Sequence, residues 1–264
     1  MFTFEKKTPC KKWNAPIAHY QENGKRKVVY YTECKCPDSI DKFKELQINP
    51  LEEQVFTPIP FFSKDQRITI SISGFSGSGK SRYCNKLVEE IIELNKKKHN
   101  DMNLERILLI TSAQESDPAY ENLGKIRLDI PYAMKNGVDI NAFANSVVIF
   151  DDFTNQPTKD MDLWVKSLEK QLLERSRKLK THLIFCSHQQ RNGFKTSLLN
   201  IESQSFVLFY QSNRNESAKL LQHYLDFSKK DIEKLFSIDN GRFSTAYINR
   251  NPRYVITNHY MYMY

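Results

Sequence analysis

Short apolar segments alternate with longer amphipathic segments over most of this chain. Five segments have the length and apolar content of buried strands: 67–73, 105–111, 146–150, 183–187 and 206–210. Four segments carry apolar residues at helical spacing: 79–98, 160–179, 216–227 and 229–236. Shorter strands are predicted over 126–130 and 242–248. Strands that alternate with helices predict an α/β fold, a mostly parallel central sheet with helices on both faces and right-handed connections.

The first 62 residues have a different pattern and are interpreted as a small N-terminal appendage. A strand is predicted over 28–32 after a turn at 22–25, and a short helix over 39–46. Three prolines between residues 50 and 60 then interrupt regular structure. We therefore expect an appendage at 1–62, a core at 63–240, and a C-terminal strand with a tyrosine-rich tail at 241–264.

The segment between the first core strand and the first core helix has the sequence GFSGSGKS, which matches the phosphate-loop pattern G-x-x-x-x-G-K-[ST]. Its glycines allow positive φ angles and let backbone N–H groups approach phosphate oxygens. The lysine can reach the β- and γ-phosphates, and the serine can hold Mg²⁺. The predicted ATP-binding residues are Gly74, Phe75, Ser76, Gly77, Ser78, Gly79, Lys80 and Ser81.

An acidic pair follows the apolar strand 146–150. In a parallel sheet this strand ends at the same edge as the strand before the glycine loop. Asp151 is therefore predicted to hold Mg²⁺ together with Ser81, and Asp152 to act as the general base on the attacking water. The alternative is an acidic turn at a strand end with no metal.

Two further segments carry candidates for catalysis, and a third carries a weaker one. The loop after strand 183–187 carries His188 and Gln189, and either could contact the γ-phosphate or orient water. An ordinary polar loop would look the same. Arg177, at the end of the helix 160–179, could supply a cation to a neighbouring subunit, and Arg214 is a weaker candidate. A cation at that position also complements the helix dipole, so both interpretations stay open.

The order of GFSGSGKS, SVVIFDDF and an arginine-containing helix that leads into THLIFCSHQ resembles the viral genome-packaging ATPases of the FtsK/HerA type. The segment TSAQESDPAYENL also resembles that group. The resemblance covers about residues 65–225 and leaves residues 1–62 unmatched. By position it implies phosphate and Mg²⁺ roles for Lys80, Ser81 and Asp151, and catalytic roles for Asp152, Arg177 and His188 or Gln189. Many related motors have glutamate at the position of Asp152, although aspartate also occurs in the viral branch.

The resemblance implies a P-loop NTPase sheet of the ASCE type, a three-layer arrangement in which one strand is inserted between the phosphate-loop strand and the strand that ends at Asp151. It also implies ATP hydrolysis coupled to the translocation of double-stranded DNA through a pentameric or hexameric ring. The implied partners are capsid or internal membrane proteins, and the implied location is the viral assembly site in the host cytoplasm, or the virion.

The charge of the chain is compatible with a polyanionic partner. The sequence has 264 residues, 39 basic against 31 acidic, and a formal net charge of +8. Solvated helix ends account for much of this lysine equally well. Candidate DNA contacts are Lys6, Lys7, Lys11, Lys12, Lys159 and the loop 191–195.

Several classes of protein are disfavoured by the sequence. No apolar run is long enough for a transmembrane helix, and the N-terminus lacks the apolar region of a secretory signal. Zinc binding by Cys10, Cys34, Cys36 and His19 is conceivable, but the usual paired spacing is absent and reduced thiols are the default. Cys84 and Cys186 are expected to be small buried apolar residues.

Three alternative functions remain open at this level. A small nucleotide kinase shares the phosphate loop, although no compact arginine-rich lid is visible. A nucleotide-gated scaffold without hydrolysis could use the appendage and the tail. A helicase-like motor on single strands differs from a packaging motor only in the DNA that stimulates it.

Overall fold

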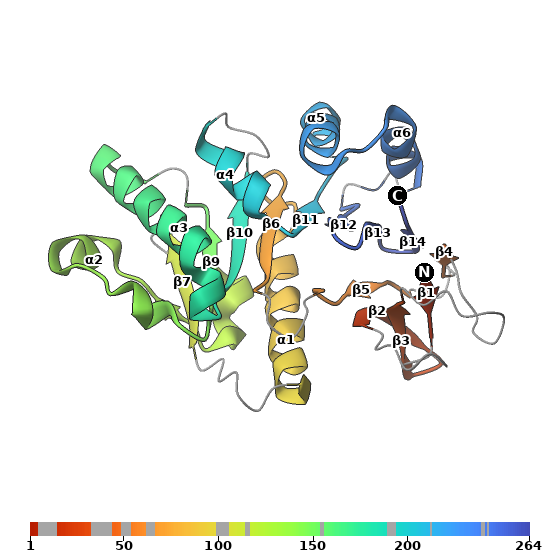
Figure 1. Ribbon diagram of the computed structural model, residues 1–264, viewed down its shortest axis with the longest axis horizontal. Helices are drawn as coiled ribbons and strands as arrows, with labels where there is room; N and C mark the ends of the chain where they lie inside the picture. Colours follow the sequence, from red (N-terminus) through yellow and green to blue (C-terminus); the bar gives the residue numbers. More distant parts are fainter. Residues whose placement is uncertain are drawn as a thin grey trace.

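The computed structural model describes residues 1–4, 15–32, 44–48, 54–61, 67–98, 106–113, 117–153, 156–188, 194–211, 213–238, 241 and 243–264. These residues form one ten-stranded sheet covered by helices and one four-stranded N-terminal sheet (Figure 1). The candidate chemistry lies on the large sheet, so the order of its strands determines which residues meet.

Six strands of the large sheet are parallel. They are β6 (Thr69–Ser73), β7 (Arg106–Thr111), β8 (Ile126–Arg127), β9 (Ser146–Asp151), β10 (His182–Ser187) and β11 (Ser205–Leu208). Their order across the sheet is β11-β6-β10-β9-β7-β8. Strand β10 is thus inserted between β6, which precedes the glycine loop, and β9, which ends at Asp151. The predicted α/β class and the inserted strand are confirmed.

Four antiparallel strands extend the sheet beyond β11. They are β12 (Ala246–Asn249), β13 (Tyr254–Ile256), β14 (Tyr260–Tyr262) and β4 (Glu45–Gln47). The tyrosine-rich tail is therefore two strands. The helix predicted over 39–46 is wrong at its end, because Glu45 and Leu46 pair with β14; residues 39–43 lie outside the described part. Pairing with a strand more than 200 residues later overrides a local preference that was weak.

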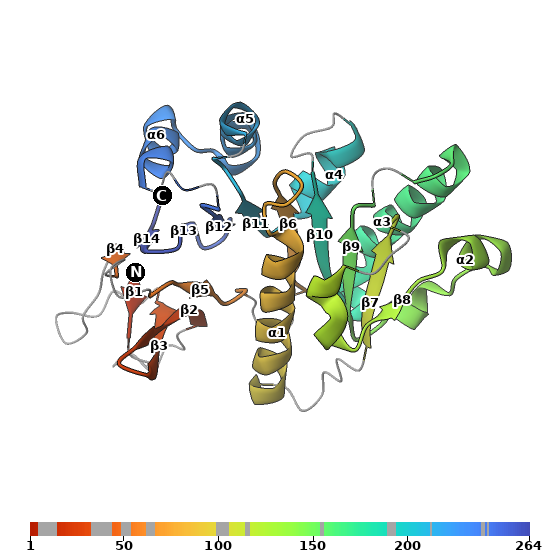
Figure 2. The ribbon, with the colours of Figure 1, turned by 180° about the vertical axis from the view of Figure 1, so that it is seen from behind.

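Helices cover both faces of the sheet (Figures 1 and 2). One face packs against α1 (Lys80–Lys98) and the 3-10 helix η2 (Pro118–Leu123). The other face packs against α2 (Ile130–Asn136), η3 (Ile140–Phe143), α3 (Lys159–Leu179), α4 (Phe194–Glu202), α5 (Arg214–Leu225) and α6 (Lys229–Ile238). Along β9, Val147 and Ile149 join the first core, and Val148 and Phe150 join the second. This three-layer burial explains why the strand is apolar at every position from Val147 to Phe150.

Two predicted strands are shorter than expected. The strand predicted over 126–130 ends at Arg127, because Asp129 accepts a hydrogen bond from the backbone N–H of Tyr132 and so caps α2. The strand predicted over 242–248 begins only at Ala246. Helix α3 matches its prediction within one residue, with Thr158 as its N-cap.

The N-terminal sheet has the order β1 (Phe2–Thr3), β3 (Lys25–Tyr31), β2 (Ala15–Glu22), β5 (Thr57–Pro58). Strands β2 and β3 form a hairpin through Asn23 and Gly24, which both have positive φ, as the predicted turn requires. Buried residues of this sheet belong to the same core cluster as the inner face of α1. The division of the chain at residue 62 stays a prediction, since β4 from the same segment pairs with the C-terminal strand.

Candidate active site

The glycine loop connects β6 to α1 in a conformation that only glycine accommodates easily. Gly77 has a φ of +71° and Gly79 a φ of +98°. A Cβ at Gly74 would lie 2.8 Å from Cβ of Phe209 and 2.8 Å from Oγ of Ser78. Gly74 therefore lets the loop lie directly against Phe209, which follows β11, while Gly77 and Gly79 supply the positive φ angles of the turn.

Polar groups of the loop are arranged for an anionic ligand. The Oγ of Ser78 is buried and has no hydrogen-bond partner among the described residues. The Nζ of Lys80 donates to the carbonyl of Phe75 at 3.0 Å, and burial lowers the pKa of this lysine. A 19-residue helix begins at Lys80 and directs its N-terminal dipole at the same place. These donors fit the phosphates of a nucleoside triphosphate, which would give Oγ of Ser78 a partner and would offer Lys80 a charged one in place of the carbonyl of Phe75.

The acidic pair lies where β9 ends, two strands away from the loop. Burial raises the pKa of Asp151 to about 6, partly offset by a hydrogen bond from Tyr120. Asp152 has a φ of +52°, an uncommon conformation for a residue other than glycine. Its backbone N–H donates to the carbonyl of Cys186 on β10, which holds the turn in place. Such local strain is common at functional sites.

His188 connects the loop with the acidic pair. Its Nδ1 lies 3.2 Å from Nζ of Lys80, and its Nε2 lies 3.0 Å from Oδ1 of Asp152. This contact follows from the strand order, because β10 runs between β6 and β9 and ends at the same edge. The structure therefore brings together Lys80, Asp152 and His188. Gln189, the other candidate in that loop, lies outside the described residues.

Tyr120 is part of this site, although it is not among the site residues predicted from the sequence. It is fully buried in η2, and its hydroxyl donates to Sγ of Cys186 at 3.8 Å. The same hydroxyl lies near the carboxylate of Asp151 and the hydroxyl of Ser81, the two predicted Mg²⁺ ligands, and it interacts favourably with the ionised carboxylate of Asp151. The sequence feature that could have pointed to Tyr120 is that it is the one aromatic residue in the polar segment 112–122, which follows a strand.

Ser81 and Asp151 also fit a divalent cation. A hydroxyl and a carboxylate are oxygen ligands of the kind that Mg²⁺ takes, with water and phosphate completing the shell. The buried hydroxyl of Tyr120 lies close to both side chains. Among the described residues no group of three or more His, Cys, Asp or Glu side chains forms a separate metal cluster. Cys10, Cys34 and Cys36 lie outside that part of the chain, and His19 pairs with Glu90. Cys84 and Cys186 are buried and free, as expected.

The predicted arginines do not reach the phosphate loop of their own chain. Arg177 is exposed in the last turn of α3, which leads into the amino end of β10. The glycine loop lies at the carboxyl end, roughly 20 Å away along the six residues of β10. Arg214 begins α5 near the loop edge, but its guanidinium donates to the carbonyl of Phe236. Any role of Arg177 in hydrolysis thus requires a second chain.

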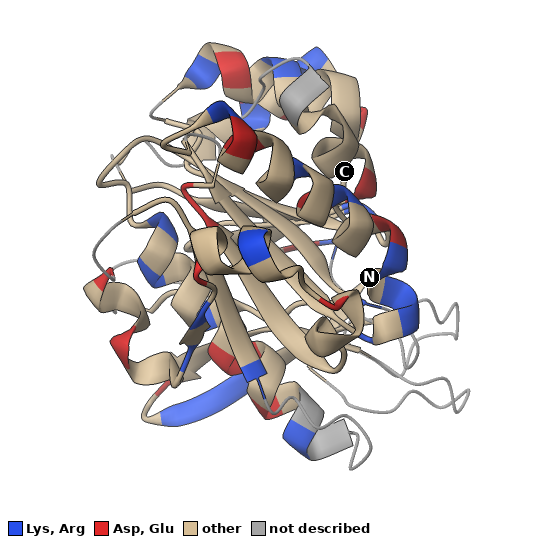
Figure 3. Cartoon of the chain, turned by 90° about the vertical axis from the view of Figure 1, so that its left-hand side faces the viewer, with Lys and Arg blue, Asp and Glu red and all other residues tan. Residues whose placement is uncertain are grey.

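Among the described residues, the charges on the side of α2 and α3 do not mark a path for DNA. Basic and acidic residues are interspersed along the helices there (Figure 3). Lys159 is exposed at the start of α3. Lys6, Lys7, Lys11, Lys12 and residues 191–193 lie outside the described residues. Within the described ranges, no helix has the length and hydropathy that a membrane crossing requires.

No protein-family model matches this sequence, and no curated protein matches it. Solved structures with a similar fold include ATPases 2 and 3 of EccC from Thermomonospora curvata, with a TM-score of 0.50 and 13% identity. That match covers 79% of this chain and 39% of the EccC chain. Structural similarity at so low a sequence identity is evidence for the fold alone. The chain therefore has the P-loop NTPase fold.

Two further solved structures have lower TM-scores. The genome-packaging NTPase B204 of Sulfolobus turreted icosahedral virus 2, in complex with AMPPCP, has a TM-score of 0.46 and 13% identity over 73% of this chain and 97% of that chain. The pCW3 conjugation coupling protein TcpA, in complex with ATPγS, has a TM-score of 0.46 and 15% identity over 94% of this chain and 77% of that chain.

Proposed function

We propose that this chain is an Mg²⁺-dependent ATPase that works in a homo-oligomeric ring and translocates double-stranded DNA during viral genome packaging. The observation that carries the ATPase is the meeting of the glycine loop, Lys80, Asp151, Asp152 and His188 at one edge of the sheet. The motif order and its resemblance to packaging ATPases support the motor. The capsid or internal membrane proteins and the viral assembly site in the host cytoplasm, or the virion, are parts of the same proposal.

Each residue of this edge has a role in hydrolysis. The loop N–H groups and Lys80 bind and orient the phosphates. Mg²⁺, held by Ser81 and Asp151, would supply charge to the β- and γ-phosphate oxygens. Asp152 accepts a proton from the attacking water. His188 contacts both Lys80 and Asp152 in this structure, so movement of Lys80 onto phosphate would free Nδ1 of His188.

The central experiment measures phosphate release with ATP and Mg²⁺ alone, with double-stranded DNA and with single-stranded DNA. A packaging motor predicts stimulation by double strands above single strands. The reverse order indicates a helicase-like motor. Tight ATP binding without phosphate release indicates a scaffold, and transfer of phosphate to a small acceptor by a monomer indicates a kinase.

The trans role of Arg177 has its own test. Arg177→Ala should abolish turnover and leave ATP binding intact. Mixed rings of Arg177→Ala and Lys80→Ala subunits should regain part of the activity, because an intact Arg177 can serve an intact neighbouring site. A mixture that stays inactive, although its subunits co-assemble by mass measurement, contradicts the shared site.

A further inference from the structure

A cavity of about 380 Å³ adjoins the glycine loop on the side away from the acidic pair. Ser78 and Gly79 belong to both the loop and the cavity wall, so a ligand bound by the loop can extend into it without a gap. Its volume is within the roughly 300–1,000 Å³ of small-molecule sites. The other lining residues used below are Val55, Phe56, Thr57, Pro58, Tyr83, Phe209, Phe243, Thr245 and Asn258.

Aromatic and apolar side chains form most of this wall. Phe209, which follows β11, is buried, and its ring meets the ring of Tyr83 on α1 edge to face with centroids 6.2 Å apart. Phe243 lines the same cavity and is 58% exposed. Flat apolar walls of this kind suit a planar heteroaromatic ligand, because such a ring gains both burial and stacking.

Asn258, between β13 and β14, is one polar residue of the wall, and Arg82 and Lys86 of α1 also line the cavity. The side-chain oxygen of Asn258 accepts a hydrogen bond from Oγ1 of Thr245 at 3.2 Å. Thr245 holds this amide in a fixed orientation, so its N–H₂ end can donate to a ring nitrogen or carbonyl of a ligand. A mostly apolar cavity with a few placed polar groups is the usual composition of a ligand site.

The N-terminal sheet supplies the remaining wall, through residues 55–58. The backbone N–H of Phe56 donates to the carbonyl of Asn258 at 2.7 Å, which joins this segment to the C-terminal strands. Thr57 and Pro58 form β5, which pairs with β2 so that Thr57 stands opposite His19.

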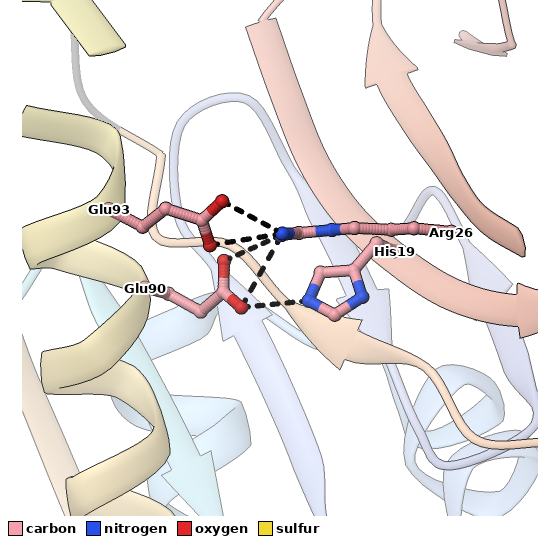
Figure 4. Close-up of polar contacts among 4 residues, drawn as sticks. All are labelled: His19, Arg26, Glu90 and Glu93. Carbon is pink, nitrogen blue, oxygen red and sulfur yellow. Dashed lines mark hydrogen bonds and ion pairs between the residues drawn. The ribbon is translucent and has the colours of Figure 1, made fainter. Parts of the chain in front are cut away.

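An ionic cluster holds that sheet against the helix that follows the glycine loop. The Nε2 of His19 lies 2.8 Å from Oε1 of Glu90, and Arg26 binds Glu90 and Glu93 at 3.0–3.5 Å. Figure 4 shows both carboxylates projecting from α1 toward His19 and Arg26 of the N-terminal sheet. Since His19 neighbours Thr57 across the β2–β5 ladder, the cluster fixes the distance between the cavity wall and α1.

We propose that this cavity binds the base and ribose of the nucleotide whose phosphates bind at 74–81, and that the N-terminal sheet is a structural part of the nucleotide site. The inference rests on the proposed ATPase and assigns a role in nucleotide binding to a segment that the family resemblance leaves unmatched. The ligand class is a nucleoside with a planar heteroaromatic base, stacked between Phe243 and the Phe209–Tyr83 wall.

The experiment compares the affinities of full-length protein for ATP and for tripolyphosphate, which has the charge but neither base nor ribose. Phe243→Ala should weaken ATP binding about fivefold or more through lost stacking. Val55→Trp should weaken it by filling the cavity. Neither variant should change the affinity for tripolyphosphate. Tyr132→Ala is the matched control, because Tyr132 is a 68% exposed aromatic residue on α2, outside the cavity lining.

The outcomes distinguish failure of the proposed nucleoside site from failure of the proposed ATPase. Loss of ATP affinity alone in both cavity variants supports the inference. Unchanged ATP affinity in both, or an equal loss for ATP and tripolyphosphate, overturns it and leaves the ATPase proposal standing if Lys80→Ala still weakens both ligands. If Lys80→Ala affects neither ligand, the proposed function itself fails. Thermal unfolding of each variant shows that a loss reflects binding and not folding.

Discussion

The phosphate side and the nucleoside side of the site are built in different ways. The phosphate side is polar and continuous in sequence over residues 74–81, and Asp151 and His188 complete it at two strand ends. The nucleoside side is mostly apolar and is assembled from segments near residues 55, 83, 209, 243 and 258. Recognition of charge needs a particular backbone turn with particular donors. Enclosure of a base needs only shape and apolar surface, which many residue combinations supply.

The largest expected effect belongs to the phosphate side. Lys80→Ala should weaken both ATP and tripolyphosphate by about ten- to a hundredfold, since a hydrogen bond to a charged group contributes roughly 1.5–3 kcal/mol, and turnover should fall to background. Titration with a fluorescent ATP analogue and with tripolyphosphate measures both affinities. If Lys80→Ala lost affinity for ATP but kept its affinity for tripolyphosphate, the phosphate side and the nucleoside side would not be separate.

The second largest effect distinguishes ATP binding from ATP hydrolysis within the phosphate side. Asp152→Asn keeps a residue that tolerates positive φ but removes the proton acceptor. We expect turnover to fall about a hundredfold or more, with ATP affinity within about threefold of the original. Steady-state phosphate release measures the turnover, and equilibrium binding measures the ATP affinity. Turnover that stays near the original value would reassign the general base.

The pH response should also differ between the two sides. With a pKa of about 6 for Asp151, the carboxylate is protonated below that pH, so Mg²⁺-dependent affinity is present at pH 7.5 and lost as the pH falls through 6. Roughly a quarter of the carboxylate is ionised at pH 5.5, which predicts about a fourfold loss at limiting Mg²⁺. Phe243→Ala should show the same slope and Asp151→Asn a flatter one, both measured by titration with Mg²⁺ at fixed ATP. Equal slopes for the original and Asp151→Asn would place the titration elsewhere.

The smallest effect concerns the support of the nucleoside side. Arg26→Met keeps the apolar stem but removes the partly exposed ion pairs with Glu90 and Glu93. A loss of about 0.5–1 kcal/mol in unfolding free energy and of about two- to threefold in ATP affinity is expected, with tripolyphosphate unchanged. Lys27→Met on the same strand is the control, because Lys27 pairs only with Glu22 within the hairpin among the contacts described. Urea unfolding and the two titrations are the measurements.

Much of the core architecture could be predicted from local pattern. The α/β class, the parallel strands and the helices α1 and α3 follow from periodicity, because each element is one continuous segment with a buried face. The helix predicted over 39–46 failed at Glu45 and Leu46, where pairing with β14 decides the conformation. The strand predicted over 126–130 ends early because Asp129 caps α2, and aspartate is a residue type that favours helix starts.

The sequence by itself determined the glycine loop, its lysine and serine, and the strand ends that carry Asp151, Asp152 and His188. Such information is local, since phosphate binding depends on a few successive backbone N–H groups at a helix start. Tertiary structure alone decided that His188 bridges Lys80 and Asp152, that Tyr120 lies close to Ser81 and Asp151, and that residues 55–58 line the same cavity as Phe243. These contacts join residues tens to nearly two hundred positions apart, and apolar residues that line a cavity have the same sequence pattern as apolar residues of the core.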